Sequence, residues 1–208
     1  RQVVFSGPHF KATFDKQSGL LVSYRYKKQE YIHNGQGPRP FFWRAPTDND
    51  YGAKLPVRLK AWKEASYQEP EAESFNVVRD KDTTAVKVTY RFPQTDARWD
   101  ITYKVYGNGV IKVDNHFVAE NAQTPMIPRV GLRMQLPARI TSLTYYGRGP
   151  EENYRDRRTS QFIGEYTSGI QDMYEPYVRP QENNHRTDIY WCTLTSKAKE
   201  GLLFVADR

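Results

Sequence analysis

The sequence predicts an all-β protein, a large antiparallel β-sandwich. Its 208 residues include 15 Tyr, 10 Phe and 4 Trp, and aromatic residues suit the pleated, half-buried surface of a sheet. Apolar and polar residues alternate with a period of two over many short stretches. Tight turns separate these stretches, which is typical of sandwiches. We expect about ten to twelve strands in a single domain that covers residues 1–208.

The first predicted hairpin joins Phe10–Phe14 to Leu20–Tyr26 through the turn Lys16–Gly19, with apolar residues at every second position of both arms. A polar stretch rich in Gly and Pro then runs from His33 to Pro40. The segment Arg44–Gly52 is full of turn formers and is expected to be a loop.

A short helix is expected at Val57–Ala65, and strands resume after it. A turn at Asp80–Asp82 and a second at Gly107–Gly109 connect neighbouring strands, the second because Asn and Gly tolerate the positive φ of a tight hairpin. The remaining expected strands are Ser74–Arg79, Thr84–Phe92, Trp99–Val105, Val110–Val118, Val130–Leu136, Ile140–Tyr146, Asp188–Thr195 and Gly201–Val205.

The net charge of +7 and the pI near 9.4 do not by themselves indicate a nucleic-acid partner. Basic residues are spread along the chain, and their densest cluster, Arg155–Arg158, is interrupted by Asp156. Nucleic-acid binding needs a clustered basic footprint. No apolar run approaches the roughly 18 residues of a membrane span. We therefore expect neither nucleic acid nor membrane as a partner.

Cys192 is the single cysteine, so no disulfide can form within the chain. It lies in an apolar strand pattern and is expected to be a buried, inert thiol. This cysteine content fits a reducing compartment without excluding export, so both cytoplasmic and exported locations stay open. The four histidines lack the spacing of metal ligands. The chain begins at Arg1 and stops just after an apolar run, and we expect a fragment that lacks its C-terminal portion.

The segment Tyr145–Arg186 is long, polar and rich in Gly, Pro and Asn, yet it contains six tyrosines. Loops longer than about 12–15 residues tend to be functional or disordered, and disordered segments are poor in aromatic residues. We therefore expect an ordered polar surface built for contact.

Two motifs have a stronger structural than functional interpretation. Gly147–Pro150 superficially resembles a phosphate-binding loop, but no helix is expected directly after it. It is predicted to be a turn that leaves the strand Ile140–Tyr146.

Asp48, Asn49 and Asp50 resemble an acidic calcium cluster, but calcium needs about six to eight oxygens from a shaped loop. Turn capping and local hydrogen bonds are the favoured role for these three residues.

Several carboxylates and one histidine suggest sugar chemistry. Glu151, Glu152 and Glu182 could supply the two carboxylates of a glycosidase, although the sequence cannot give their separation. Glu182 and His185 could act as general acid and base on a hemiacetal, as in aldose epimerases. The favoured alternative is that this pair hydrogen-bonds the backbone of its own loop.

Planar polar groups and aromatic rings suited to sugars are frequent in the same regions. The polar groups are on Arg179, Gln181, Asn183, Asn184 and Arg186. The rings that could stack on a pyranose are Trp43, Tyr145, Tyr154, Tyr174, Tyr177 and Trp191. Each ring, taken singly, is more often part of core or loop packing.

Four long motifs carry a family resemblance. FDKQSGLLVSYRYKKQEYI (Phe14–Ile32), FWRAPTDNDYG (Phe42–Gly52), YYGRGPEENYRDR (Tyr145–Arg157) and MYEPYVRPQENNHR (Met173–Arg186) occur in this order. Together they resemble the C-terminal β-sandwich domain of the β-galactosidases of glycoside hydrolase family 2. The resemblance covers nearly the whole chain.

The resemblance implies a multidomain parent that hydrolyses terminal non-reducing β-D-galactose residues. Its (β/α)-barrel would carry the two catalytic glutamates and the magnesium ligands, so no catalytic residue and no cofactor is expected in this chain. The domain itself would be a supersandwich of the galactose-mutarotase-like kind. In well-known members a tryptophan near the far C-terminal end reaches the sugar, and this chain stops before that region.

The partners implied by the resemblance are the barrel of the same polypeptide and a galactoside substrate, and a homo-oligomer of the parent stays open. The residues expected to face the barrel or to bind carbohydrate are Trp43, Arg44, Asp48, Asn49, Arg179, Glu182, Asn183, His185 and Arg186. Two alternatives stay open: a stand-alone carbohydrate-binding module, and an aldose-1-epimerase-like enzyme that uses Glu182 and His185.

Overall fold

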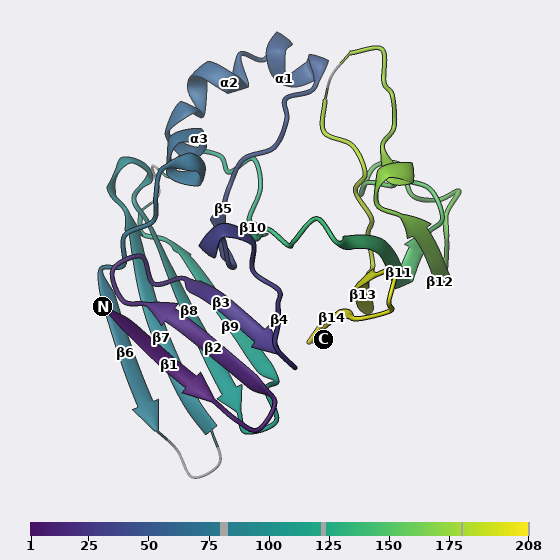
Figure 1. Cartoon of the computed structure of the whole chain (residues 1–208). Helices are drawn as coiled ribbons and strands as arrows, with labels where there is room; N and C mark the ends of the chain where they lie inside the picture. The colour runs from purple at the N-terminus through teal and green to yellow at the C-terminus, as the bar shows by residue number, and fades with distance from the viewer. Residues whose placement is uncertain (80–82, 122–123, 180, 208) are drawn as a thin grey trace. The chain divides into compact units, whose positions relative to one another are not determined.

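The computed structural model describes residues 1–79, 83–121, 124–179 and 181–207 (Figure 1). Its described residues form 14 strands, and every strand pairing is antiparallel. The predicted all-β class is therefore confirmed. Contacts divide the chain into two compact units, Arg1–Arg44 with Asp50–Leu136 and Ala45–Asn49 with Pro137–Arg208. Two expectations stay predictions: that both units form one domain, and that this domain is a supersandwich.

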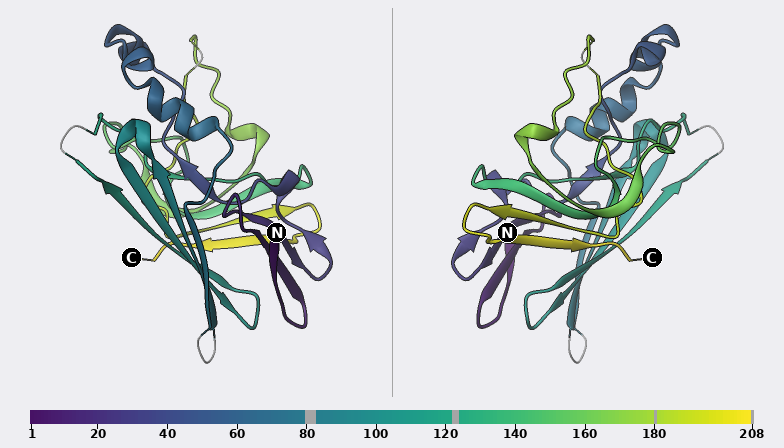
Figure 2. Two further views of the ribbon diagram at one scale, coloured as in Figure 1. Left: turned by 90° about the vertical axis from the view of Figure 1, so that its left-hand side faces the viewer. Right: turned by 90° about the vertical axis from the view of Figure 1, so that its right-hand side faces the viewer.

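The first unit is a β-sandwich of two four-stranded sheets, which form two layers in Figure 2. The first sheet consists of β1 (Gln2–Ser6), β2 (Phe10–Asp15), β3 (Leu21–Tyr26) and β4 (Gln29–Glu30). The second consists of β6 (Ser74–Arg79), β7 (Thr83–Phe92), β8 (Ala97–Tyr106) and β9 (Ile111–Ala119).

The core of the first unit lies between these sheets. Every second residue of β8 is buried, as the alternation predicts. The rings of Phe14 and Tyr103 join the two layers, with centroids 5.1 Å apart. Phe42 lies at the centre of an aromatic cluster, 4.7 Å from the ring of Trp62 and 5.3 Å from that of Trp99. Such ring pairs add about 0.5–1.5 kcal/mol each beyond the area that they bury.

Shorter elements connect the sheets of the first unit. A two-stranded ribbon pairs β5 (Arg39–Phe41) with β10 (Gly131–Arg133). The α-helices are α1 (Asp48–Gly52), α2 (Leu55–Arg58) and α3 (Lys60–Tyr67), and the 3-10 helices are η1 (His33–Gly35) and η2 (Pro93–Thr95). The first two residues of α1, Asp48 and Asn49, belong to the second unit. No helix among the described residues has the length and apolar character needed to cross a membrane.

The second unit contains one four-stranded sheet in the order β12–β11–β13–β14. Its elements are β11 (Ile140–Gly149), β12 (Phe162–Gly169), β13 (Trp191–Ser196), β14 (Gly201–Val205) and the 3-10 helix η3 (Gln171–Met173). Cys192 lies on β13, half buried, and burial raises the pKa of its thiol, as expected for an inert cysteine.

Several sequence expectations are wrong in the second unit. Gly147–Pro150 is not a turn after a strand that ends at Tyr146, because β11 continues to Gly149. It continues because β12 supplies partners, with Gly147 opposite Gly164 and Gly149 opposite Phe162. The segment Tyr145–Arg186 is therefore not one long loop. The strand β12 begins with two adjacent exposed apolar residues, Phe162 and Ile163, so it lacks the alternation of apolar and polar residues that marks a strand.

Other differences concern the first unit. The Arg44–Gly52 loop contains α1, which is too short to show apolar periodicity. The helix expected at Val57–Ala65 is divided into α2 and α3. The strand expected at Val130–Leu136 pairs over only three residues, since its partner β5 has proline at its centre and at its flank, and proline donates no ladder hydrogen bond. The turn expected at Asp80–Asp82 lies outside the described residues.

Candidate functional site

Two of the residues predicted to face the barrel or to bind carbohydrate, Trp43 and Arg44, belong to the first unit. The Trp43 side chain is only 6% exposed and packs in the core, so it offers no free face for a sugar. Arg44 donates to the carboxylate of Asp50 over 2.8 Å. This ion pair supports the interpretation of the Asp48–Asp50 motif as a structural one.

The exposed predicted residues of the second unit include Asp48 and Arg179. Their side chains are 66% and 76% exposed, and Arg179 Nη1 lies 3.4 Å from Asp48 Oδ1. An ion pair this exposed contributes little to stability. Asn49 is also exposed, next to Asp48 on α1. These polar groups are available for contact with a partner.

The remaining loops of the second unit converge on Asn153, whose residue surface is 0% exposed. Its amide Nδ2 donates to the carbonyls of Arg148 and Glu151, both over 3.0 Å. Its Oδ1 accepts from the backbone N–H of Thr187 over 3.0 Å and from the Thr187 hydroxyl over 2.5 Å. This amide therefore ties the end of β11 to the segment that leads into β13.

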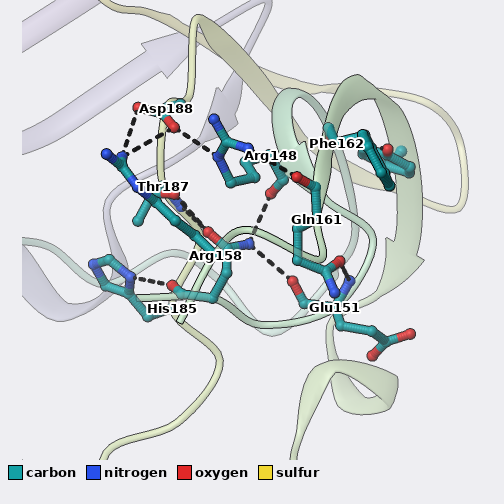
Figure 3. A network of polar contacts seen from close by, with 10 residues as sticks. Arg148, Glu151, Arg158, Gln161, Phe162, His185, Thr187 and Asp188 are labelled. Carbon is teal, nitrogen blue, oxygen red and sulfur yellow. Dashed lines mark hydrogen bonds and ion pairs between the residues drawn. The ribbon is translucent and has the colours of Figure 1, made fainter. Parts of the chain in front are cut away.

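Arg148, Arg158 and Asp188 form an ion-paired cluster in the same loops (Figure 3). Asp188 accepts from Arg148 Nε over 2.8 Å and from Arg158 Nη1 over 3.3 Å. Arg148 Nη1 also donates to the carbonyl of Gln161 over 2.8 Å, and the Gln161 side chain accepts from the Glu151 backbone over 3.0 Å. The cluster therefore fixes the loop between β11 and β12 in place.

Glu152 is engaged within the same loops. Its side chain is 6% exposed, and it forms an ion pair with Arg157 and accepts from the Asn184 backbone. Arg157 lies over the ring of Tyr154, 4.6 Å from its centroid, and donates to the hydroxyl of Tyr177. The Glu152 carboxylate therefore neutralises Arg157 and ties the loop after β11 to the segment that contains Asn184.

His185 contacts the backbone of the loop that follows β11. Its Nδ1 lies 2.8 Å from the carbonyl oxygen of Asn153. A carbonyl can only accept, so Nδ1 carries a proton. The ring stacks on Tyr154, with centroids 4.7 Å apart and planes 14° apart. His185 thus contacts a backbone carbonyl, as the structural interpretation expects, but that carbonyl belongs to another loop. For Asn183, Nδ2 donates to the Glu175 carbonyl, and Glu182 is half buried.

Arg186 lines a cavity of about 210 Å³ in the second unit. Its Nε donates to the hydroxyl of Tyr145 over 3.1 Å, and that hydroxyl donates to the carbonyl of Pro150 over 3.2 Å. Burial raises the pKa of Tyr145, and Arg186 partly opposes this shift. The cavity is lined by Tyr145, Pro150, Glu151, Glu152, Tyr166, Thr167, Ser168, Asp172, Met173, Glu175 and Arg186.

Most of these lining residues were not singled out from the sequence. The central role of Asn153 was also missed, because its partners Thr187 and Arg148 lie 34 and five positions away. The sequence signal that points to the role of Asn153 is an asparagine in a stretch rich in Gly and Pro. Among the described residues, no group of three or more His, Cys, Asp or Glu side chains is arranged to hold a metal ion.

Known proteins similar to this chain share one description. The family model described as the beta galactosidase small chain matches residues 6–207. A β-galactosidase of Priestia megaterium is 36% identical over 95% of this chain and 19% of the relative. The β-galactosidase of Lactobacillus delbrueckii subsp. bulgaricus is 33% identical over 97% of this chain and 20% of the relative. That of Streptococcus thermophilus is 32% identical over 96% of this chain and 19% of the relative. The chain thus spans about a fifth of the length of these relatives.

Proposed function

The chain belongs to the beta galactosidase small chain family, and we propose that it is the accessory β-sandwich part of a longer β-galactosidase. That enzyme would hydrolyse terminal non-reducing β-D-galactose residues by the two-carboxylate route. Both catalytic carboxylates, and any catalytic magnesium, would come from residues outside this chain. The observation that carries the proposal is the match over nearly the whole chain to about a fifth of each relative.

The internal bonding of the candidate site supports an accessory role. A retaining glycosidase needs two carboxylates that face one sugar, about 5–5.5 Å apart. Glu152 is instead paired with Arg157, and Asp188 with Arg148 and Arg158. Loops fixed in this way suit a wall beside a catalytic centre, because a wall must keep its shape while substrate enters and product leaves.

The exposed polar residues Asp48, Asn49 and Arg179 are our candidates for contact with the catalytic barrel. They carry charge and hydrogen-bonding groups on the surface, as the polar rim of an interface does. Trp43 is excluded from this set because its ring is buried in the core.

Two measurements test the proposal. The first is an activity assay of the chain alone, which should not hydrolyse an aryl β-galactoside. Turnover that disappears when its own glutamates are substituted would contradict the accessory role.

The second measurement uses the Priestia megaterium β-galactosidase, prepared without the fifth of its length that matches this chain. Adding the chain should restore measurable hydrolysis, and Arg179→Ala should lower the restored activity. Lys87→Ala, on an exposed position of β7, is the matched control.

Carbohydrate binding is a second candidate function, favoured by the cavity beside Tyr145. Its volume of about 210 Å³ and its lining by Tyr166, Thr167, carboxylates and Arg186 suit a single monosaccharide. Calorimetric titration with galactose and lactose tests this function. Binding heat that Tyr166→Ala abolishes would support it, and no heat at millimolar sugar would exclude it.

A further inference from the structure

The ribbon of β5 and β10 brings two arginines together in the first unit. Its register places Arg39 directly opposite Arg133. Like charges directly opposite one another on paired strands destabilise a sheet. A fold that places two guanidinium groups at one register position therefore gains from a negative charge between them.

Arg39 is unusually buried for a charged residue, with 8% of its surface exposed. Its Nη1 donates to Gln36 Oε1 over 3.3 Å, and its Nη2 donates to the carbonyl of Gln68. Its Nε is buried and has no hydrogen-bond acceptor among the residues that the structure describes. Buried charges are normally paired and hydrogen-bonded, because a buried donor without an acceptor lowers stability.

The acid nearest to Arg39 in the described ion pairs is Glu69, whose carboxylate lies 4.0 Å from Nη1. The Glu69 side chain is 79% exposed, so water screens most of its effect. Burial lowers the pKa of Arg39. The charge of Glu69 opposes this shift, and the charge of Arg133 lowers the pKa further. Two guanidinium groups and one exposed carboxylate leave an excess positive charge at this position.

Arg133 is held in a fixed position by aromatic rings. Its guanidinium carbon lies 5.1 Å from the ring centroid of Phe41 and 5.8 Å from that of Tyr67. Stacking on ring faces leaves the N–H groups at the guanidinium edge free to donate in their own plane. No side-chain hydrogen bond between described residues uses the Arg133 guanidinium as a donor.

A cavity of about 250 Å³ lies at this pair of arginines. Most of its lining side chains are polar, and the lining is supplied by Gln36, Arg39, Ser66, Tyr67, Glu69, Arg133, Met134 and Gln135. The volume is sufficient for a small oxyanion with its remaining hydration. Arginine forks match the geometry of carboxylate and phosphate oxygens.

We propose that the Arg39–Arg133 pair forms a binding site for a small oxyanion, with the buried Nε of Arg39 and the edge of Arg133 as its donors. Both phosphate and carboxylate present this chemistry. All residues of the site belong to the first unit, and the proposal does not depend on the accessory role.

The test is a titration of the full chain followed by the side-chain Nε–Hε nuclear magnetic resonance signals of arginine. Sodium phosphate is added at constant ionic strength, balanced with sodium chloride, and sodium acetate is titrated in a parallel arm. We expect a saturable shift of the Arg39 signal. The arm with the lower dissociation constant identifies the preferred oxyanion.

Arg133→Gln should raise the dissociation constant at least tenfold, and Arg133→Lys should raise it less, because the lysine keeps the charge but lacks the fork. Arg133 is exposed, so these variants are expected to fold. Arg58→Gln, an exposed arginine on α2, is the control and should leave the constant unchanged. A shift that never saturates in either arm would overturn the proposal, and so would equal losses in the Arg133→Gln and Arg58→Gln variants.

Discussion

Asn153 shows how one short side chain can organise several loops. An asparagine amide offers two donors and one oxygen with two acceptor positions. In this protein both donors and both acceptor positions are used, each by a group from a loop near β11 or β13. Because the residue is fully buried, water cannot replace any of these bonds. Removing the amide therefore leaves several buried polar groups without partners.

We expect Asn153→Ala to lower the free energy of unfolding of the second unit by about 2–4 kcal/mol, since each unmet buried group costs about 1–3 kcal/mol and relaxation recovers part of the loss. Hydrogen exchange of the paired amides of β11 and β13, whose own hydrogen bonds do not involve the Asn153 side chain, measures the effect. Asn76→Ala, on an exposed position of β6, should stay within about 0.5 kcal/mol of the wild type. An equal effect of the two substitutions would contradict the role given to Asn153.

Glu30 makes the free energy of unfolding of the first unit depend on pH. Burial alone would raise its pKa, but hydrogen bonds from Ser23, Ile32 and Tyr24 outweigh burial and lower it. A carboxyl whose folded pKa is depressed stabilises the protein above its unfolded pKa, about 4.3. That stability is lost as the pH falls below this value and through the folded pKa.

Glu30→Gln should therefore flatten the decline of unfolding free energy between about pH 5 and pH 3. Urea unfolding followed by tryptophan fluorescence across this range measures the decline. Glu71→Gln, at an exposed position, is the matched control and should keep the wild-type slope. If Glu30→Gln keeps that slope as well, the carboxylate is not the group that titrates.

At the scale of elements, the pairing of β11 with β12 depends on close backbone packing at Gly149. A Cβ atom at this position would lie 2.1 Å from the Tyr145 hydroxyl oxygen and 2.9 Å from a ring carbon of Tyr166. Real Cβ atoms do not approach other atoms so closely. An alanine would therefore displace the Tyr145 side chain that lines the cavity of the second unit.

We expect Gly149→Ala to destabilise the second unit by about 1–3 kcal/mol through overpacking. Gly131→Ala on β10, where a Cβ meets no atom within 4 Å, is the control and should be nearly neutral. Tyr145→Phe removes the clashing hydroxyl, so the double variant should lose less stability than the sum of the two single variants. Purely additive losses in this double-mutant cycle would argue against the clash.

The strands that could be predicted from the sequence are those with one face packed in the core. Strands β7 and β8 were predicted to within two residues, because one face of each packs in the core and the alternation is clear. The strand β12 was missed because its two largest apolar residues, Phe162 and Ile163, are exposed. The helix α1 was missed because five residues cannot show a helical period.

The candidate site was predictable only in outline. Its region, Tyr145–Arg186, was recognised from composition, but the individual bonds were not. Asn153, Thr187 and Asp188 meet through contacts between positions far apart in the chain, which only the register of β11, β12 and β13 determines. The arginine pair of β5 and β10 has the same origin, since 94 positions separate Arg39 from Arg133 (133 − 39 = 94).

At the scale of the whole molecule, the two units differ greatly in how much apolar surface they bury. The main core cluster consists of 19 buried residues, all from the first unit. In the described part of the second unit, the buried apolar side chains are Ile140, Tyr145 and Met173. Burial of apolar area is the dominant favourable contribution to folding. The stability of the second unit therefore depends more strongly on its polar network.

We expect this difference to appear as unequal protection from amide hydrogen exchange in the isolated chain. The amides of β7 and β8 should exchange slowest, because they open only when the aromatic core of the first unit unfolds. Those of β13 and β14 should exchange faster, since Leu203 and Val205 remain largely exposed there. Mass spectrometry of peptic fragments can compare these strands within one sample.

A core substitution separates the two units in the same experiment. Phe42→Ala removes the centre of the aromatic cluster and should cost about 3–5 kcal/mol, so protection of β7 and β8 should fall by several hundred-fold. Protection of β11–β14 should change little, because the packing lost is confined to the first unit. An equal loss of protection in all of these strands would show that the units unfold as one, because exchange from both would then require the same global opening.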